Sequence, residues 1–127
     1  MSCNVFTGEY IGTARNHVAI IIEKESDKTC HKYHVVGTVL MGMTYETRPD
    51  ERPDESPTYV DGTQRLIGRI RETDIPRFEE ICEAVPPPGP QLKLNGQPID
   101  PTKLVRRCSD WVREVMEKVL AEDIVTP

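Results

Sequence analysis

One cysteine and two histidines have the types and order that thiol-based acyl chemistry requires. A thiol becomes a nucleophile when a neighbouring imidazole, or the positive end of a helix, favours the thiolate. His17 opens a strongly apolar segment, His34 lies in the next such segment, and Cys108 lies in the early part of the final helical pattern. The set of residue types for a Cys-His site is therefore complete. Cys108 also fits the apolar stripe of that helix, so a buried structural cysteine is the alternative interpretation.

Arg107 and Trp111 lie on either side of Cys108 and are the candidate substrate-binding residues. The planar guanidinium of Arg107 could hold a carboxylate or phosphate beside the thiol, although solvated arginines are commoner. Trp111 follows Cys108 by about one helical turn, where a bulky side chain would line the site or pin the helix to a sheet. Packing is the commoner role for such a tryptophan, and both interpretations stay open.

Cys30, His31 and His34 form a second chemical set, because thiolate and imidazole are ligands that zinc prefers. In an extended strand, residues three apart point to opposite faces. His31 and His34 would then be unable to share one metal ion. We therefore expect no metal ion and no other cofactor.

Three segments rich in β-branched and apolar residues predict strands, at 17–22, 32–40 and 63–71. The first is a continuous apolar run, which suits a central strand covered on both faces. A short polar turn joins it to the second, so the two should pair as an antiparallel hairpin. Residues 1–16 predict an N-terminal arm that could include a short strand.

Two helices are predicted in the second half of the chain. The first covers 73–85, where apolar side chains recur at helical spacing. A proline-rich linker at 86–90 precedes the second helix, which Asp100 and Pro101 would begin as an N-cap acid followed by proline. Strands followed by helices predict an α+β fold, an antiparallel sheet with helices packed on one side.

Composition indicates one domain without a membrane span. The chain has 127 residues and a formal net charge of −5, which suits a single domain over 1–127. No segment supplies the basic surface of a nucleic-acid-binding protein, and no apolar run approaches the ~20 residues that span a bilayer. The N-terminus lacks the pattern of a signal peptide. We expect a cytoplasmic protein with four reduced cysteines, acting on a small molecule or peptide.

One further segment has a composition of its own. Residues 46–57 contain three prolines and five acidic residues. No apolar side chain there could offset the entropy of ordering the segment. The sequence predicts a mobile acidic loop.

The chemical residues also lie in motifs that resemble a known superfamily. His17 stands in His-Val-Ala-Ile-Ile-Ile, His34 in Tyr-His-Val-Val-Gly, and Cys108 in Arg-Cys-Ser-Asp-Trp-Val. The order resembles the circularly permuted, papain-like NlpC superfamily, especially its lecithin:retinol acyltransferase-like branch, which has Asn-Cys-Glu at the cysteine. The resemblance implies a permuted papain-like fold in which Cys108 attacks an acyl carbon, His17 is its base and His34 orients His17.

The chain also resembles a group of small fungal proteins with the same histidine-led strand, Pro-Pro-Pro-Gly linker and Cys-x-x-Trp helix. That likeness covers nearly the whole chain and implies no activity. The sequence thus predicts a cysteine-dependent hydrolase or acyltransferase that works through a covalent thioester. The alternative is a non-catalytic binding or host-interaction protein with the same fold. The two differ in whether the Cys108 sulfur opens onto a pocket near an imidazole.

Overall fold

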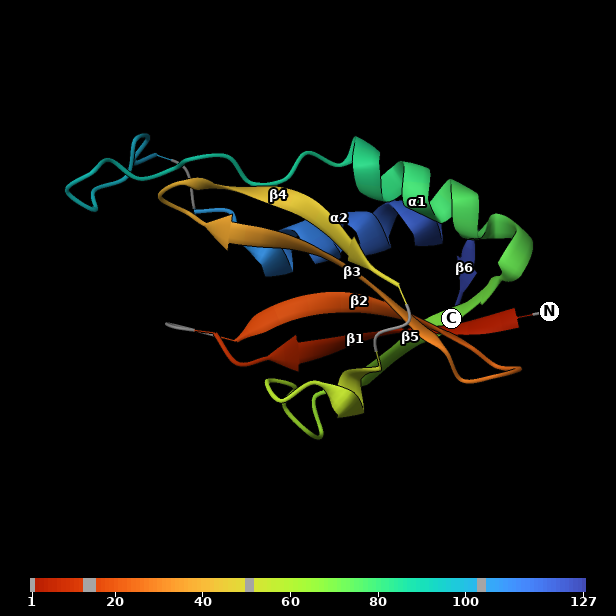
Figure 1. Ribbon diagram of the computed structural model, residues 1–127. Coiled ribbons are helices and arrows are strands. Elements are labelled where there is room, and N and C mark those ends of the chain that lie inside the picture. The colour runs from red at the N-terminus through yellow and green to blue at the C-terminus, as the bar shows by residue number, and fades with distance from the viewer. Residues whose placement is uncertain (1, 13–15, 50–51, 103–104) are drawn as a thin grey trace.

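The computed structural model describes residues 2–12, 16–49, 52–102 and 105–127 (Figure 1). In these ranges, strands form one sheet and two α-helices lie against it. The strands are β1 (Ser2–Tyr10), β2 (His17–Lys24), β3 (Cys30–Thr38), β4 (Gly42–Arg48), β5 (Arg65–Arg71) and β6 (Val125–Thr126). The helices are α1 (Ile75–Ala84) and α2 (Cys108–Ala121), with short 3-10 helices η1 (Pro53–Glu55) and η2 (Glu72–Asp74).

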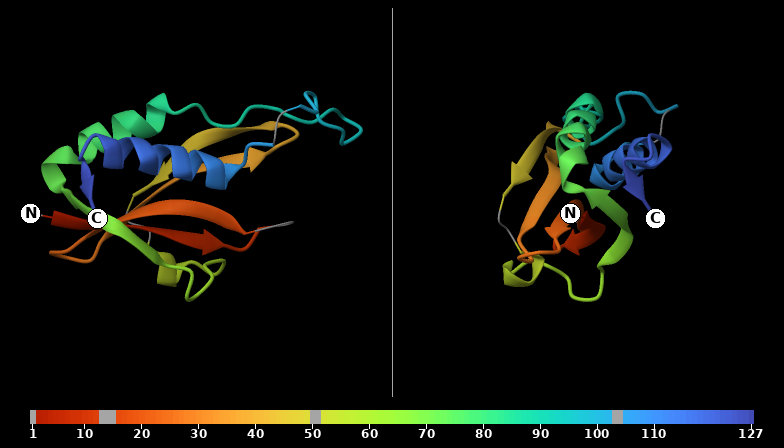
Figure 2. Two further views of the ribbon diagram at one scale, coloured as in Figure 1. Left: turned by 180° about the vertical axis from the view of Figure 1, so that it is seen from behind. Right: turned by 90° about the vertical axis from the view of Figure 1, so that its right-hand side faces the viewer.

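The sheet is antiparallel throughout, with the strand order β4-β3-β2-β1-β5-β6. Both helices lie on the same side of the sheet (Figure 2). The main core fills the space between these layers, where Val5, Ile20 and Val35 of the sheet meet Phe78 of α1 and Trp111 of α2. The expected α+β class, with an antiparallel sheet, is therefore confirmed.

The expectation that the apolar run after His17 forms a central strand is also confirmed. β2 lies between β1 and β3, and successive side chains of a strand point to opposite faces. Ile20 and Ile22 face the helices, whereas Ile21 packs with Phe6 and Cys30 on the other face. All three isoleucines are buried, so β2 is covered on both sides.

Two strands lie where the sequence predicts little regular structure. The expected N-terminal arm contains β1, whose nine residues place it between β2 and β5. The expectation of a mobile loop over 46–57 is wrong for residues 46–48, because β4 continues through Arg48. Later in the same segment, Pro53 is buried in the short helix η1. Residues 50–51 of this segment lie outside the described residues. Hydrogen bonding to β3 holds residues 42–48 in a strand. Gly37 and Gly42, which both have positive φ, flank the turn between the two strands.

The predicted helix over 73–85 is confirmed as α1, but the start expected for the last helix at Asp100 is wrong. α2 begins at Cys108 instead. Within the described ranges, neither helix has the length and apolar character that crossing a bilayer requires.

β2 and β3 diverge toward one end of the sheet. Their ladder runs only from the pair Glu23–Cys30 to the pair Ile20–Tyr33. Beyond it, β2 stays paired with β1 as far as His17, and β3 stays paired with β4 as far as Thr38. The strands therefore separate in the region that contains His17 and His34, as the view in Figure 1 shows.

Candidate active site

A chain of hydrogen bonds joins His17, His34 and Glu46 across three strands. Nε2 of His17 lies 2.7 Å from Nδ1 of His34. Nε2 of His34 lies 3.1 Å from a carboxylate oxygen of Glu46, which is directly opposite His34 in the β3–β4 ladder. The other oxygen of Glu46 pairs with Arg48 at 2.6 Å. The carboxylate is thereby held in place and ends the chain.

Glu46 decides which nitrogen of each imidazole carries the proton. An ionised carboxylate only accepts hydrogen bonds, so Nε2 of His34 must donate. A neutral His34 then has no proton on Nδ1, which accepts the Nε2–H of His17. This assignment leaves the lone pair of His17 on Nδ1, which has no hydrogen-bond partner among the described residues. Nδ1 is therefore the basic atom of His17.

Both imidazoles are held in the neutral form. Burial lowers the pKa of His34 to about 4, with repulsion from a protonated His17 and from Lys32 acting in the same sense and Glu46 opposing them. Burial also lowers the pKa of His17, and Lys32 again adds to the effect while Glu46 opposes it. The ammonium of Lys32 lies 4.4 Å from the centre of the Tyr10 ring. At neutral pH, His17 is therefore able to accept a proton.

Acidification is expected to destabilise the protein through His34. Its folded-state pKa of about 4 lies below the usual 6.5, so the unfolded state binds more protons between these values. The contribution of neutral His34 to the free energy of unfolding is complete above the unfolded-state pKa and is lost as the pH falls toward the folded-state pKa. Between about pH 7 and about pH 5, the loss should be about 2 kcal/mol, measured by urea denaturation. His34→Gln is the control, and an equally steep pH dependence in that variant would assign the effect to other groups.

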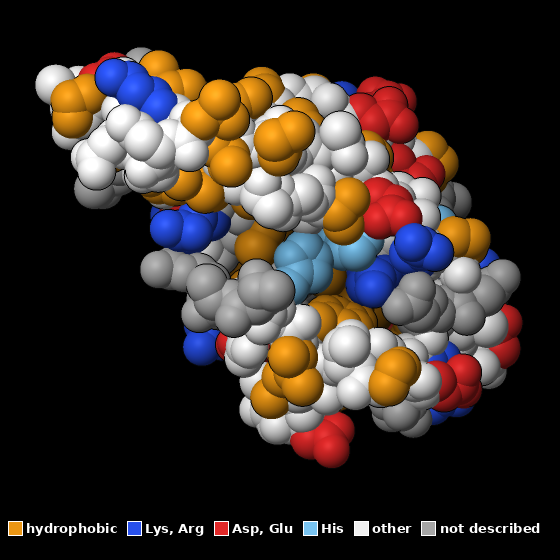
Figure 3. All heavy atoms as spheres, turned by 60° about the vertical axis from the view of Figure 1, so that its left-hand side comes forward, with side chains coloured by type: hydrophobic (Ala, Val, Ile, Leu, Met, Phe, Trp, Pro, Cys, Tyr) orange, Lys and Arg blue, Asp and Glu red, His pale blue; other side chains and the backbone are white. Residues whose placement is uncertain are grey.

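Cys108 and His17 line one pocket of about 260 Å³. Its other described lining residues are Gly12, Asn16, Val35, Gly37, Thr38, Val39, Met43 and Arg107. Figure 3 shows histidine side chains at the floor of a hollow on this face of the molecule. The structure therefore brings Cys108 and His17 to one cavity, and His34 lies behind His17 as its hydrogen-bond partner.

Cys108 is the first residue of α2, at its positive end. The carboxylate of Asp110 accepts the backbone N–H of Arg107 at 2.7 Å, which caps the helix there. The carboxylate of Asp100, expected to begin the helix, instead accepts hydrogen bonds from the backbone and hydroxyl of Thr102 in a local turn. Capping by Asp110 thus explains why α2 begins later than Asp100 and Pro101 suggest.

The Cys108 thiol and His17 share a pocket without a hydrogen bond between them. Among the described residues, no hydrogen bond joins Cys108 to His17 or His34. Cys108 is partly buried and packs against the edge of the main core. It differs in this from Cys82, which is fully buried on α1. Cys108 is therefore neither sealed in the core nor engaged by a base.

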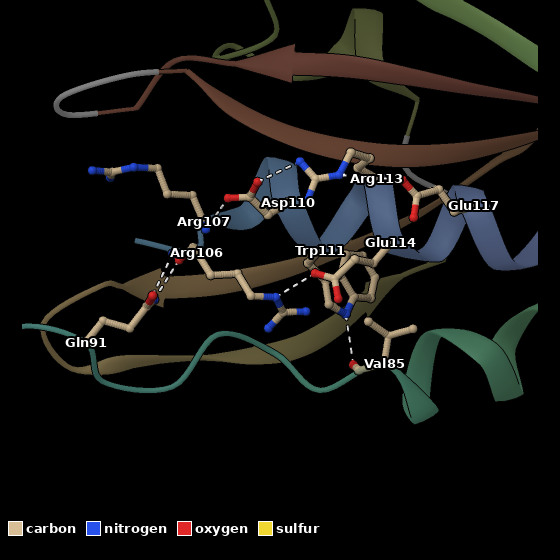
Figure 4. Close-up of polar contacts among 9 residues, drawn as sticks. All are labelled: Val85, Gln91, Arg106, Arg107, Asp110, Trp111, Arg113, Glu114 and Glu117. Carbon is tan, nitrogen blue, oxygen red and sulfur yellow. Dashed lines mark hydrogen bonds and ion pairs between the residues drawn. The ribbon is translucent and has the colours of Figure 1, made fainter. Parts of the chain in front are cut away.

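Arg107 and Trp111, the two predicted substrate-binding residues, occupy different environments. Arg107 lines the pocket. Trp111 is 0% exposed, and its indole N–H donates to the carbonyl oxygen of Val85 at 3.1 Å (Figure 4). Trp111 therefore packs α2 against the end of α1 and offers no surface to a ligand in this structure.

The second chemical set, Cys30, His31 and His34, is not gathered in one place. His31 stacks on the Tyr33 ring, with centroids 4.5 Å apart, and lines a different cavity of about 330 Å³. Cys30 packs with Phe6, while His34 bonds His17. In the part of the chain that the structure describes, no cluster of three or more potential ligands is positioned to hold a metal ion.

Sequence reasoning missed Glu46 and Lys32. Glu46 was hidden by the acidic, proline-rich composition of the residues that follow it. The alternation of Met43, Thr44, Tyr45 and Glu46 after Gly42 is a strand signal, and a hairpin from Gly37 would have placed Glu46 opposite His34.

Lys32 could have been found more directly. It lies two residues before His34 on the same strand, and residues at that spacing share a face.

The comparisons with known proteins give one match. No curated protein and no solved structure matches the chain. One protein-family model, described as a family of unknown function (DUF6540), matches residues 5–126. This range contains every residue of the candidate site, from His17 to Cys108. The chain belongs to the DUF6540 family.

Proposed function

We propose that this protein is a cysteine-dependent hydrolase or acyltransferase, with Cys108 as nucleophile and His17 as base on a permuted papain-like fold. The observation that carries the proposal is the His17–His34–Glu46 chain, which leaves a lone pair on Nδ1 of His17, a residue that lines the same pocket as Cys108. The substrate is a small molecule or peptide with an ester, thioester or amide bond. The pocket volume of about 260 Å³ suits an acyl group of modest size.

The first half of the reaction forms a thioester. The proton of the Cys108 thiol passes to Nδ1 of His17, and the sulfur bonds to the acyl carbon. The carbonyl oxygen gains negative charge, which the positive end of α2 favours. When the oxyanion collapses, the bond to the alcohol, thiol or amine breaks, and that leaving group takes the proton from His17.

The second half releases the acyl group. His17 takes a proton from water or from another acceptor, which attacks the thioester carbon. The carbon–sulfur bond breaks, and the thiolate recovers the proton from His17. Water gives hydrolysis and another nucleophile gives acyl transfer, so the acceptor alone separates the two activities.

His34 and Glu46 act through His17 and are positioning residues. They hold the imidazole in one tautomer and one orientation, as the third member of a nucleophile–base–orienter set does. The contact between Cys108 and His17 forms when substrate occupies the pocket, since catalytic hydrogen bonds are often long before substrate binds.

An acyl-enzyme on Cys108 is the expected result when the protein meets an activated ester. Native protein is mixed with p-nitrophenyl acetate, quenched with acid and mapped by mass spectrometry. We expect the acetyl group on Cys108, and none on the buried thiols of Cys3, Cys30 and Cys82. Cys108→Ser should lose this thioester adduct while staying folded.

The non-catalytic alternative gives the opposite result. In that case, Cys108 of the native protein carries no acetyl group at any ester concentration, although it reacts once the protein is unfolded. Acetyl groups confined to lysines would equally reject the proposal.

A further inference from the structure

The pocket around Cys108 has a charge opposite to that of the whole protein. The chain carries a formal net charge of −5. Among the described lining residues of the pocket there is no acidic side chain, and Arg107 is the charged one. Because His17 is held neutral by its lowered pKa, the guanidinium sets the local charge. The guanidinium of Arg107 thus gives a positive charge to the pocket of the candidate nucleophile, although the protein as a whole is acidic.

Neighbouring acids do not neutralise Arg107. Glu114 pairs with the Nε of Arg106 at 2.6 Å. Asp110 pairs with Arg113 at 3.0 Å and also accepts the backbone N–H of Arg107. The guanidinium of Arg107 extends away from these acids in Figure 4, and no ion pair engages it among the described residues.

The backbone that carries Arg107 is fixed on both sides. The side-chain amide of Gln91 accepts the N–H of Arg106 at 2.5 Å and donates to its carbonyl oxygen at 2.6 Å. The carbonyl oxygen of Arg107 accepts N–H groups from Asp110 and Trp111 at 3.0 and 3.2 Å. These contacts anchor the base of the Arg107 side chain at the pocket, so less entropy is lost when it binds a ligand.

From this arrangement we infer that Arg107 selects acyl substrates that carry a carboxylate near the scissile carbonyl. The inference rests on the proposed function. A planar guanidinium matches a carboxylate with two parallel hydrogen bonds. One guanidinium in a pocket that is otherwise neutral balances a single negative charge, which fits a carboxylate better than a doubly charged phosphate. The negative protein surface repels such substrates elsewhere, so the attraction is local to the pocket.

Two alkylating reagents of nearly the same size test this charge preference. Iodoacetate carries a carboxylate and iodoacetamide carries a neutral amide, while both transfer their carbon to a thiolate with loss of iodide. The ratio of their rate constants at Cys108 is measured by mass spectrometry in the native protein. The ratio cancels changes in thiol reactivity that affect both reagents equally.

Arg107→Gln is expected to lower the iodoacetate-to-iodoacetamide ratio about three- to tenfold, the range for a partly exposed charge-assisted contact. Added salt should lower the ratio of the native protein in the same direction. The matched control is Arg65→Gln, which removes the same charge from an exposed position on β5. That variant should keep the native ratio.

The outcomes separate this inference from the proposed function. A Cys108 that reacts with both reagents at a ratio unaffected by Arg107→Gln overturns the carboxylate preference and leaves the nucleophile in place. An equal fall of the ratio in Arg65→Gln also overturns it, because the effect would then come from net charge. A Cys108 inert to both reagents in the folded protein rejects the proposed function itself, and the inference with it.

Discussion

Replacing His17 by alanine is expected to slow acetyl transfer from p-nitrophenyl acetate to Cys108 by about 10²- to 10⁴-fold, the usual contribution of a general base. His34→Ala should slow it less, by about tenfold, because the proposed mechanism has His34 act only through its hydrogen bond to His17. Stopped-flow release of nitrophenolate measures both rates, and circular dichroism checks that each variant is folded. Equal rates in the native protein and His17→Ala would remove His17 from the mechanism.

The pH dependence of the acetyl-transfer rate tests whether Glu46 positions His17 or only stabilises the fold. The proposed mechanism requires neutral His17, so the rate should fall on the acid side at a pH set by the lowered pKa of His17. Glu46 raises the pKa of both histidines. Glu46→Gln should therefore shift the acid limb to lower pH while also reducing the rate. A limb that stays in place, or moves to higher pH, would show that Glu46 is not coupled to the base.

Truncating Trp111 to alanine is expected to lower the free energy of unfolding by about 3–5 kcal/mol. The side chain is 0% exposed, so its removal leaves a cavity between α2 and the sheet. The carbonyl oxygen of Val85 also loses its partner. Trp111→Phe keeps much of the volume and should cost less, about 1–2 kcal/mol for the lost hydrogen bond and the shape change. Urea denaturation measures both, and a loss below about 1 kcal/mol in Trp111→Ala would mean that the core closes over the gap.

Much of the fold follows from local patterns in the sequence. The run from His17 to Ile22 is apolar on both faces of a strand, so a central position is the only one that buries all of it. Because only a short polar turn separates β3 from β2, the two strands pair as an antiparallel hairpin. In α1, Phe78 and Cys82 recur at helical spacing and both face the core, and such periodicity depends on nothing distant.

Other elements depend on contacts that no local pattern contains. β4 exists because β3 offers it an edge, and the residues after Arg48 conceal it by their acids and prolines. The start of α2 depends on a competition between Asp100 and Asp110. Asp100 has the better cap sequence, but Gln91, from another part of the chain, binds both the N–H and the carbonyl oxygen of Arg106 just before α2 begins. A local sequence pattern does not reveal a hydrogen bond between residues as far apart in the chain as Gln91 and Arg106.

The candidate site was predicted by residue type and not by geometry. His17, His34 and Cys108 follow from their places on strands and helix, whereas Glu46 follows only from the register of the β3–β4 ladder. The lowered pKa of each histidine depends on burial and on Lys32. How deeply the rings of His17 and His34 are buried depends on where β2 and β3 separate, and the pairing of the whole sheet determines that point.

The divergence of β2 and β3 also determines how the molecule can open. β2 is paired with β1 along its full length, but the β3–β4 hairpin is joined to β2 by a ladder of about half that length. A short seam inside a sheet is a natural boundary for partial unfolding, in which one cooperative unit detaches while the rest stays native. His34 and Glu46 would leave with the hairpin, and His17 would remain on β2 without the partner that sets its tautomer. A ligand that contacts both β2 and the β3–β4 hairpin would therefore stabilise the docked hairpin and, with it, the hydrogen bond between His17 and His34.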